Sequence, residues 1–266
     1  MNILVANDDG IKAEGIKELV KALSKVEGVS VYVVAPDSQR SGASHSITMF
    51  KDLYFKEEPF ENAKKAYSFT GTPADCVKMG IALLESQGIN IDMVFSGINH
   101  GGNLGTDTLY SGTVGAAREG LINNKVSVAV SVASHEPIGF QYAAMLAQKT
   151  AKYYVENGLP KIAEYLWNIN VPNIPEEEIK GVKLTKLGIR DYADWFNPEY
   201  KEDGTIHIFY GGEPIWREDV RCQRPETADV VAIEEKYATI TPLNENTTCE
   251  KKLDEMAKKG TFKECL

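Results

Sequence analysis

The chain has 266 residues, 43% of them hydrophobic and 25% charged, which suits a large globular domain with a smaller appendage and excludes a disordered or fibrous protein. Its 38 acidic residues outnumber its 29 basic residues, for a formal charge of −9. Because proteins that bind nucleic-acid polymers usually carry a basic balance, this charge argues against DNA or long RNA as a partner. A small phosphorylated substrate remains compatible if a bound cation supplies local positive charge.

The cysteines are few and widely spaced, at positions 76, 222, 249 and 265, which predicts neither a zinc knuckle nor a disulfide framework. No stretch approaches the ~18 apolar residues of a membrane span, and the N-terminal residues lack the basic segment of a signal peptide. We therefore expect a cytoplasmic protein with reduced thiols and no membrane partner.

Strands and helices are expected to alternate from the first residues onward. Residues 3–6 form a short apolar run that ends in polar turn residues, as a buried parallel strand does. Apolar residues then recur at helical spacing over residues 16–23, and a second apolar run occupies residues 29–35. Strand, helix and strand in this order predict the βαβ unit of a parallel sheet.

The alternation continues to about residue 175. Thr72, Pro73 and Asp75 have the chemistry of a helix start, with a capping hydroxyl, a proline at the first position and an acid at the third. Further strands are expected at residues 92–98, 126–133 and 167–171, and further helices at residues 113–121 and 139–156. Residues 1–175 are therefore predicted to form a doubly wound, mostly parallel α/β core of Rossmann-like type.

The pattern changes after Pro172, where short strand-like pieces occur at residues 182–187, 206–210 and 238–241 and a short helix is expected at residues 251–258. Several aromatic residues in this part look exposed, namely Tyr192, Trp195, Phe196 and Tyr200. Two interpretations are equally compatible with this pattern. Residues 176–266 form either an arm that docks on a neighbouring subunit or a peripheral β layer of the same subunit.

Polar residues follow three of the predicted strands, at the edge where an open parallel sheet binds its ligands. The first strand is followed by Asp8 and Asp9, the second by residues 39–42 (Gln-Arg-Ser-Gly), and the third by residues 99–103 (Asn-His-Gly-Gly-Asn). All three segments offer oxygen ligands, and their glycines allow a backbone or an anion to approach closely. Their convergence predicts an oxygen-lined site.

Two adjacent carboxylates at the end of a buried strand repel each other, so keeping both ionised requires a counter-charge. A hard divalent cation provides one and prefers oxygen ligands. The alternative for Asp8 and Asp9 alone is an ordinary capped turn into the first helix. The oxygen-bearing residues Ser41 and Asn99 at the neighbouring strand ends favour the metal site.

Residues Ser111, Gly112 and Thr113 precede a predicted helix, where free backbone N–H groups and the positive end of the helix dipole attract anions. This segment is either an ordinary N-cap or a phosphate cradle, and its position soon after the third strand favours the cradle. Arg40 is either an anion clamp or a solvated surface residue. His45 and His100 flank the same loops, and the sequence assigns no role to either.

These motifs resemble the SurE family of 5′/3′-nucleotidases, the stationary-phase survival proteins. The matching blocks are residues 3–11 (ILVANDDGI), 33–48 (VVAPDSQRSGASHSIT), 71–77 (GTPADCV), 96–120 (SGINHGGNLGTDTLYSGTVGAAREG), 168–172 (NINVP) and 240–243 (ITPL). They occur in the family's order across nearly the whole chain. One departure is Gly102, after which the family often has proline and this chain has Asn103.

The resemblance implies one divalent metal ion, Mg²⁺ or Mn²⁺, held by Asp8, Asp9, Ser41 and Asn99. It implies that Ser111, Gly112 and Thr113 line the phosphate site with Asn103 at its rim. It also implies a C-terminal segment exchanged between subunits of a homodimer or homotetramer, which favours residues 176–266 as an oligomerisation arm.

The predicted activity is direct, metal-dependent hydrolysis of nucleoside 5′- and 3′-monophosphates, with Asp8 and Asp9 as the catalytic residues. In this mechanism the cation neutralises phosphate oxygens and lowers the pKa of a water that attacks phosphorus in line. One alternative is a broader phosphatase that also acts on polyphosphate or sugar phosphates. A second, less favoured because no acidic ligand is missing, is a nucleotide sensor that binds without hydrolysis.

Overall fold

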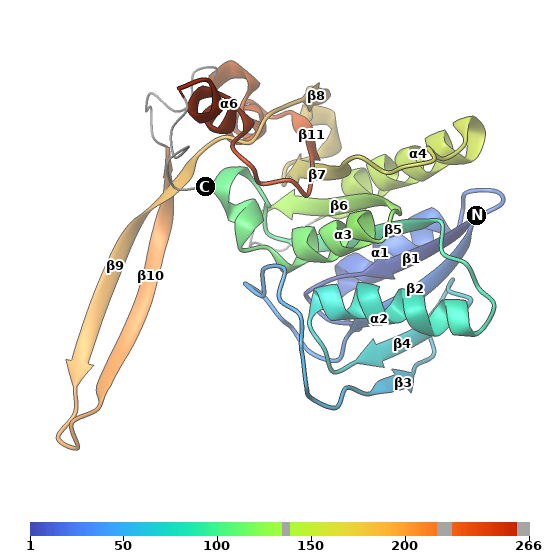
Figure 1. The fold of residues 1–266 in the computed structure, drawn as a ribbon, viewed down its shortest axis with the longest axis horizontal. Coiled ribbons are helices and arrows are strands. Elements are labelled where there is room, and N and C mark those ends of the chain that lie inside the picture. The colour runs from blue at the N-terminus through green and yellow to red at the C-terminus, as the bar shows by residue number, and fades with distance from the viewer. Residues whose placement is uncertain (135–138, 217–224, 260–266) are drawn as a thin grey trace.

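The computed structural model describes residues 1–134, 139–216 and 225–259. Its body is one nine-stranded sheet with the strand order β3-β4-β2-β1-β5-β6-β7-β11-β8 (Figure 1). The strands of this sheet are β1 (Asn2–Ala6), β2 (Ser30–Pro36), β3 (Phe55–Glu57), β4 (Lys65–Phe69), β5 (Met93–His100), β6 (Val126–Ala133), β7 (Leu166–Pro172), β8 (Val182–Leu184) and β11 (Ala238–Leu243).

The sheet reverses its winding at β1. This strand pairs in parallel with β2 on one side and with β5 on the other. The chain first builds outward through β2 and β4, then returns to build through β5, β6 and β7, all in parallel. In such a sheet the crevice beyond the carboxyl ends of the strands at the reversal is the usual ligand site. The ends of β2, β1 and β5 meet at this point.

Helices cover both faces of the sheet. On one face lie α1 (Glu14–Leu23) and α4 (Gln141–Asn157), and on the other α2 (Pro73–Ser86) and α3 (Gly112–Ile122) (Figure 1). Because successive side chains of a strand point to opposite faces, Ile3 packs into the core under α1 whereas Leu4 packs into the core under α2. Burial on both faces explains why the first strand is continuously apolar.

The C-terminal part divides into two structural elements. β11 pairs antiparallel with β7, and β8 pairs in parallel with β11, so both belong to the main sheet. Between them, β9 (Arg190–Tyr200) and β10 (Ile206–Trp216) form an antiparallel hairpin that extends away from the body (Figure 1). Two helices, α5 (Asp229–Glu234) and α6 (Glu250–Lys259), complete this part. A short 3-10 helix, η1 (Gly105–Leu109), leads into α3, and two single-turn ones are η2 (Glu176–Glu178) and η3 (Pro225–Thr227).

The predicted α/β fold, Rossmann-like and doubly wound, is confirmed. The main sheet nevertheless continues beyond residue 175 into β8 and β11, which form the peripheral layer that was one of the two interpretations. The division at residue 175 and the exchange of residues 176–266 between subunits stay predictions. No helix of the described residues is both long and apolar enough to cross a membrane.

Three strands were not expected from the sequence. β3 and β4 lie in a stretch of mixed charged and aromatic residues, and β9 lies in the segment of exposed-looking aromatics, for which no strand was predicted. The helix start at Thr72 is confirmed. Its hydroxyl accepts from the Asp75 N–H at 3.1 Å, and the Asp75 carboxylate accepts from the Thr72 N–H at 2.9 Å.

We predict that Thr72→Ala lowers stability by about 1 kcal/mol, because the N–H of Asp75 loses its capping acceptor. In a chain of this size such a loss lowers the melting temperature by roughly 2–4 °C, measurable by calorimetry. Thr72→Ser retains the hydroxyl and is the matched control. Equal melting temperatures for the alanine variant and the wild type would show that the cap contributes nothing.

Candidate active site

A cavity of about 880 Å³ opens beyond the carboxyl ends of β1, β2 and β5. This volume lies in the range of sites that bind small molecules. Its wall combines residues from the strand ends, from the turn before α3 and from the base of the hairpin. They are Asp8, Ser41, Gly42, Asn99, His100, Gly101, Gly102, Asn103, Thr106, Asp107, Tyr110, Ser111, Ile189, Arg190, Asp191, Tyr192 and Gly212.

Asp8 follows β1 directly and is only 4% exposed. Its Oδ1 accepts a hydrogen bond of 2.6 Å from the Thr113 hydroxyl at the start of α3. Loss of hydration on burial raises the pKa of Asp8 from 3.8 to about 6, the bond from Thr113 opposes this shift, and the neighbouring charge of Asp9 adds to it. A buried carboxylate in this setting favours either a proton or a cation as its partner.

Asp9 ties the loops at the three strand ends together. One of its oxygens lies 3.5 Å from Nε2 of Gln39, and the other accepts from the backbone N–H of His100 at 3.2 Å. Gln39 also donates to the hydroxyl of Ser41 at 2.9 Å. The ends of β1, β2 and β5 therefore meet around Asp9, as expected from their sequence positions.

Asn99 lies next to an irregularity in β5, where the pairing with β6 shifts register between Ser96 and Asn99. Such irregularities re-aim side chains beside functional sites. The Asn99 side chain donates from Nδ2 to the carbonyl of Gly101 at 2.7 Å. Among the described residues none donates to its Oδ1, so a neutral oxygen ligand is held beside the cavity.

The first turn of α3 lies behind Asp8. Ser111 is the N-cap, and its Oγ accepts from the N–H of Val114 at 3.0 Å. Gly112 packs directly on Asp8, where a Cβ atom would come within 2.9 Å of the Asp8 Cβ. The N–H groups that begin a helix have no acceptor within it, and together with the dipole they attract an anion.

Asn103 belongs to a buried polar network at the floor of the cavity. It donates from its backbone N–H to Asn170 at 2.8 Å and from Nδ2 to Ser131 at 2.7 Å. Its carbonyl accepts from Asn168 and Asn170 at 2.8 and 3.0 Å. These bonds connect the end of β5 to β6 and β7 and fix where the turn before α3 begins.

The structure thus brings five of the predicted site residues to the cavity wall, which are Asp8, Ser41, Asn99, Asn103 and Ser111. The other three lie outside the wall but contact residues in it. Asp9 accepts from the N–H of His100, Gly112 packs on Asp8, and Thr113 donates to Asp8. The Thr113 hydroxyl donates a hydrogen bond to Asp8, so its role in this structure is to position the Asp8 carboxylate. The proposed metal-binding and catalytic roles stay predictions.

Two of the basic residues near these loops have structural partners. Arg40 lies 3.2 Å from Asp37 and outside the cavity wall. His45 bonds at 2.8 Å to Glu119, a buried carboxylate that also accepts from Lys78 at 2.8 Å. These bonds attach the loop after β2 to α3 and α2. His100 lines the cavity.

Sequence reasoning missed the outer wall of the cavity. Asp107 lies between two predicted site residues in sequence and was passed over, although an acid within that block was a usable signal. Arg190 and Asp191 carried no signal, because a residue at the base of a hairpin reaches the site only through the fold. Tyr192 was expected to be an exposed docking residue, and instead it is partly buried and lines the cavity.

The donor set fits a hard divalent cation. Among the described residues no group of three or more His, Cys, Asp or Glu side chains gathers that could hold a metal ion by itself, so a site here also needs neutral oxygen ligands. The proposed ligands are instead two carboxylates, of Asp8 and Asp9, together with the hydroxyl of Ser41 and the amide oxygen of Asn99. An all-oxygen set of this kind suits Mg²⁺ or Mn²⁺.

The fold and the cavity together define an α/β protein with an acidic, oxygen-lined site beside a helix N-terminus, at the reversal point of a parallel sheet. The family described as "Survival protein SurE" matches residues 3–194. This chain belongs to the SurE family.

Individual relatives match over nearly the whole chain. The protein named 5'-nucleotidase SurE from Desulforamulus reducens is 41% identical over 256 residues, which cover 93% of this chain and 94% of that protein. The protein of the same name from Trichodesmium erythraeum is 40% identical, with 97% of each covered. The crystal structure of the SurE protein from Aquifex aeolicus aligns with a TM-score of 0.78 at 33% identity, covering 96% of this chain and 98% of that one.

We predict that Asp8→Asn stabilises the protein in EDTA near neutral pH. Because the pKa of Asp8 is raised from 3.8 to about 6 in the folded state, the Asp8 carboxyl group holds its proton more tightly in the folded protein than in the unfolded chain. Stability from this group is therefore present below pH 3.8 and lost as the pH rises through about 6. The free energy of unfolding of the variant, measured by urea denaturation, should exceed that of the wild type by on the order of 3 kcal/mol at pH 7 and should nearly equal it near pH 4. A difference independent of pH would contradict this origin.

Proposed function

We propose that the protein is a divalent-metal-dependent phosphomonoesterase that hydrolyses nucleoside 5′-monophosphates, and also 3′-monophosphates, to nucleoside and phosphate. The observation that carries the proposal is one cavity beside the N-terminus of α3 that is lined by Asp8, Ser41 and Asn99. Asp9 adjoins it through its bonds to Gln39 and to the N–H of His100. Relatives over nearly the full length bear the name 5'-nucleotidase SurE, which supports the substrate class.

Each residue has a role that follows from its chemistry. Asp8, Asp9, Ser41 and Asn99 would hold one Mg²⁺ or Mn²⁺ ion. When bound, the ion supplies charge neutralisation at the phosphate and a water of lowered pKa. Hydrolysis forms a bond between a water oxygen and phosphorus and breaks the bond to the nucleoside oxygen, which leaves with a proton. One of the two aspartates accepts the proton of the attacking water.

The start of α3 would hold the phosphate. The N–H groups of Gly112 and Thr113 stand at the positive end of the helix dipole, and the Ser111 hydroxyl lies at the cavity wall. Groups fixed in this way stabilise the charge on the equatorial phosphate oxygens without reorganising during the reaction. The hydrogen bond from Thr113 keeps Asp8 against this cradle and so fixes the position of the carboxylate relative to the phosphate site.

Two other candidates share these residues. A broader phosphatase acting on polyphosphate is less favoured, because the outer wall carries the carboxylates of Asp107 and Asp191. Of the described residues that line the cavity, Arg190 alone is a lysine or arginine, so a chain of phosphates would meet two carboxylates there. A sensor that binds without hydrolysis is disfavoured because both acidic residues are in place at the site. The predicted location in the cytoplasm stays a prediction.

We expect the purified chain to release phosphate from AMP with Mn²⁺ or Mg²⁺ and to stop in excess EDTA. Asp8→Asn should lower turnover at least about 100-fold while the circular dichroism spectrum is unchanged. Asp52→Asn, an exposed carboxyl outside the cavity, is the matched control. A panel of ribo- and deoxyribonucleoside monophosphates, a sugar phosphate and tripolyphosphate separates the alternatives. Wild-type activity in the Asp8→Asn variant with metal present would refute the assignment.

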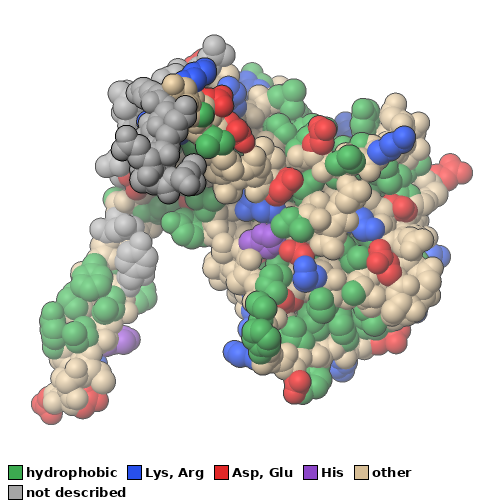
Figure 2. Space-filling view, viewed as in Figure 1, with side chains coloured by type: hydrophobic (Ala, Val, Ile, Leu, Met, Phe, Trp, Pro, Cys, Tyr) green, Lys and Arg blue, Asp and Glu red, His purple; other side chains and the backbone are tan. Residues whose placement is uncertain are grey.

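We further infer that the hairpin contacts a second copy of the chain, in a homodimer or a homotetramer. Figure 2 shows hydrophobic side chains gathered along the hairpin. They include Trp195, Phe196, Tyr200, Ile206, Ile208 and Phe209, all exposed to solvent. A two-stranded hairpin is only marginally stable alone in water, and an apolar surface of this kind marks an interface. Closed symmetric assemblies are the usual result when the partner is identical.

The double substitution Phe196→Lys with Ile208→Lys, on one face of the hairpin, should lower the molar mass measured by light scattering, because it places two charges in the apolar interface. Tyr54→Lys changes an exposed aromatic on the body and should leave the mass unchanged. A wild-type mass equal to that of one chain would remove the basis for this interface.

A further inference from the structure

The turn before α3 carries an acidic residue that the proposed chemistry does not use. Asp107 lies in η1, halfway between Asn103 at the cavity floor and Ser111 at the phosphate cradle. All three residues line the same cavity. A group joined directly to a phosphate at Ser111 therefore lies along the wall that contains Asp107.

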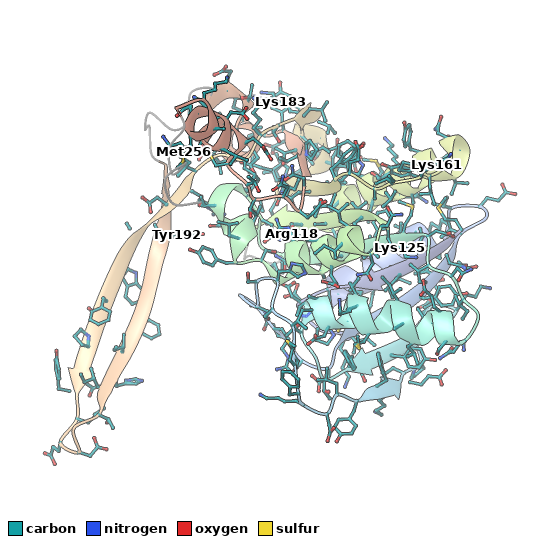
Figure 3. The ribbon with its side chains drawn as sticks, in the orientation of Figure 1. Arg118, Lys125, Lys161, Lys183, Tyr192 and Met256 are labelled. Atoms are coloured by element: carbon teal, nitrogen blue, oxygen red, sulfur yellow. The ribbon has the colours of Figure 1, made fainter. Side chains whose placement is uncertain are left out.

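Arg190 and Tyr192 both hold the same oxygen of the Asp107 carboxylate. Its Oδ2 accepts from Nη1 of Arg190 at 2.9 Å and from the hydroxyl of Tyr192 at 2.7 Å. Figure 3 shows Tyr192 at the base of the hairpin, beside the turn that leads into α3. Among the described residues, none donates a hydrogen bond to Oδ1. The Asp107 side chain remains 16% exposed and lines the cavity.

The turn itself is anchored by a buried carboxylate. Asp229, at the start of α5, is fully buried and accepts from the N–H groups of Gly105 and Gly188, each at 2.8 Å. Gly105 has a φ of +52°, and a Cβ atom there would lie 2.8 Å from the Gly188 carbonyl. The turn and the chain leading into β9 are thus clamped together, which places Asp107 against Arg190 and Tyr192.

A fixed carboxylate with a free oxygen selects among possible ligands. It repels a second phosphate, and the charge of Arg190 is already engaged by Asp107. It accepts strongly from a neutral O–H group, since hydrogen bonds to charged acceptors are about twice as strong as neutral ones. In a nucleoside monophosphate the group next to the phosphate is a sugar that carries such hydroxyls.

We propose that Asp107 binds a hydroxyl of the nucleoside sugar through Oδ1, and that Arg190 and Tyr192 position its carboxylate for this contact. The inference rests on the proposed nucleotidase function and adds a sugar-binding site to it. Asp107 is therefore a specificity residue that distinguishes a nucleotide from a phosphate ester without a sugar.

The test compares kcat/KM for AMP, 2′-deoxy-AMP, 3′-deoxy-AMP and p-nitrophenyl phosphate, with Mn²⁺ present. Asp107→Ala should lower kcat/KM for AMP about 10- to 100-fold, because a hydrogen bond to a charged group is lost. Activity on p-nitrophenyl phosphate should be unchanged. In the wild type one of the two deoxy substrates should be poorer than AMP by the same factor, and Asp107→Ala should abolish that difference.

Tyr192→Phe removes one donor to Asp107 and should lower the ratio of AMP to p-nitrophenyl phosphate activity in the same direction by a smaller factor. Asp107→Asn preserves the shape of the side chain, so it tests the proposal even if the alanine variant does not fold. Its AMP activity should fall with that on p-nitrophenyl phosphate retained. Asp203→Ala, an exposed carboxyl at the far end of the hairpin, should behave as wild type.

Equal losses on AMP and p-nitrophenyl phosphate in both Asp107 variants would overturn the proposal, because the residue would then act on the fold or the phosphate site. Equal wild-type rates on AMP and both deoxy substrates would also overturn it. An absence of metal-dependent phosphate release by the wild type from every substrate would instead refute the proposed function on which the inference rests.

Discussion

The burial of the Asp8 carboxylate at the end of β1, beside a second carboxylate on Asp9, is the constraint on which the site depends. Asp8 is buried and Asp9 lies beside it, so the metal-free protein carries an unfavourable charge where its core ends. The hydroxyl of Thr113 and the backbone N–H of His100 offset this only in part. Stability is thus traded for a local excess of negative charge, which is the property that attracts a cation.

The strand order of the sheet brings the remaining donors together. Because β1 lies between β2 and β5 in the sheet, the residues after these three strands are neighbours, although they are far apart along the chain. The same geometry places the start of α3 behind Asp8, where Gly112 allows close contact. The cation ligands and the anion cradle of the proposed function are therefore consequences of one strand order.

The inner half of this arrangement was predictable from the sequence, and the outer half was not. Apolar runs such as residues 3–6 and 126–133 identify strands that are buried on both faces, and the residues after them identify the site. β3 and β4 lack such runs because they lie toward the edge of the sheet. Arg190 and Tyr192 reach the cavity only because Asp229 clamps their chain to the turn that contains Asp107. No local pattern encodes a contact of that range.

The pairing of β11 with β7 has a consequence for biosynthesis. β7 ends at Pro172, whereas its partner begins at Ala238, after the whole hairpin has been made. While the chain emerges from the ribosome, the edge of β7 therefore remains open, with its backbone groups available to any extended segment. In the finished chain β11 occupies this edge. β7 therefore keeps an unpaired edge for as long as the 65 residues between Pro172 and Ala238 take to be made.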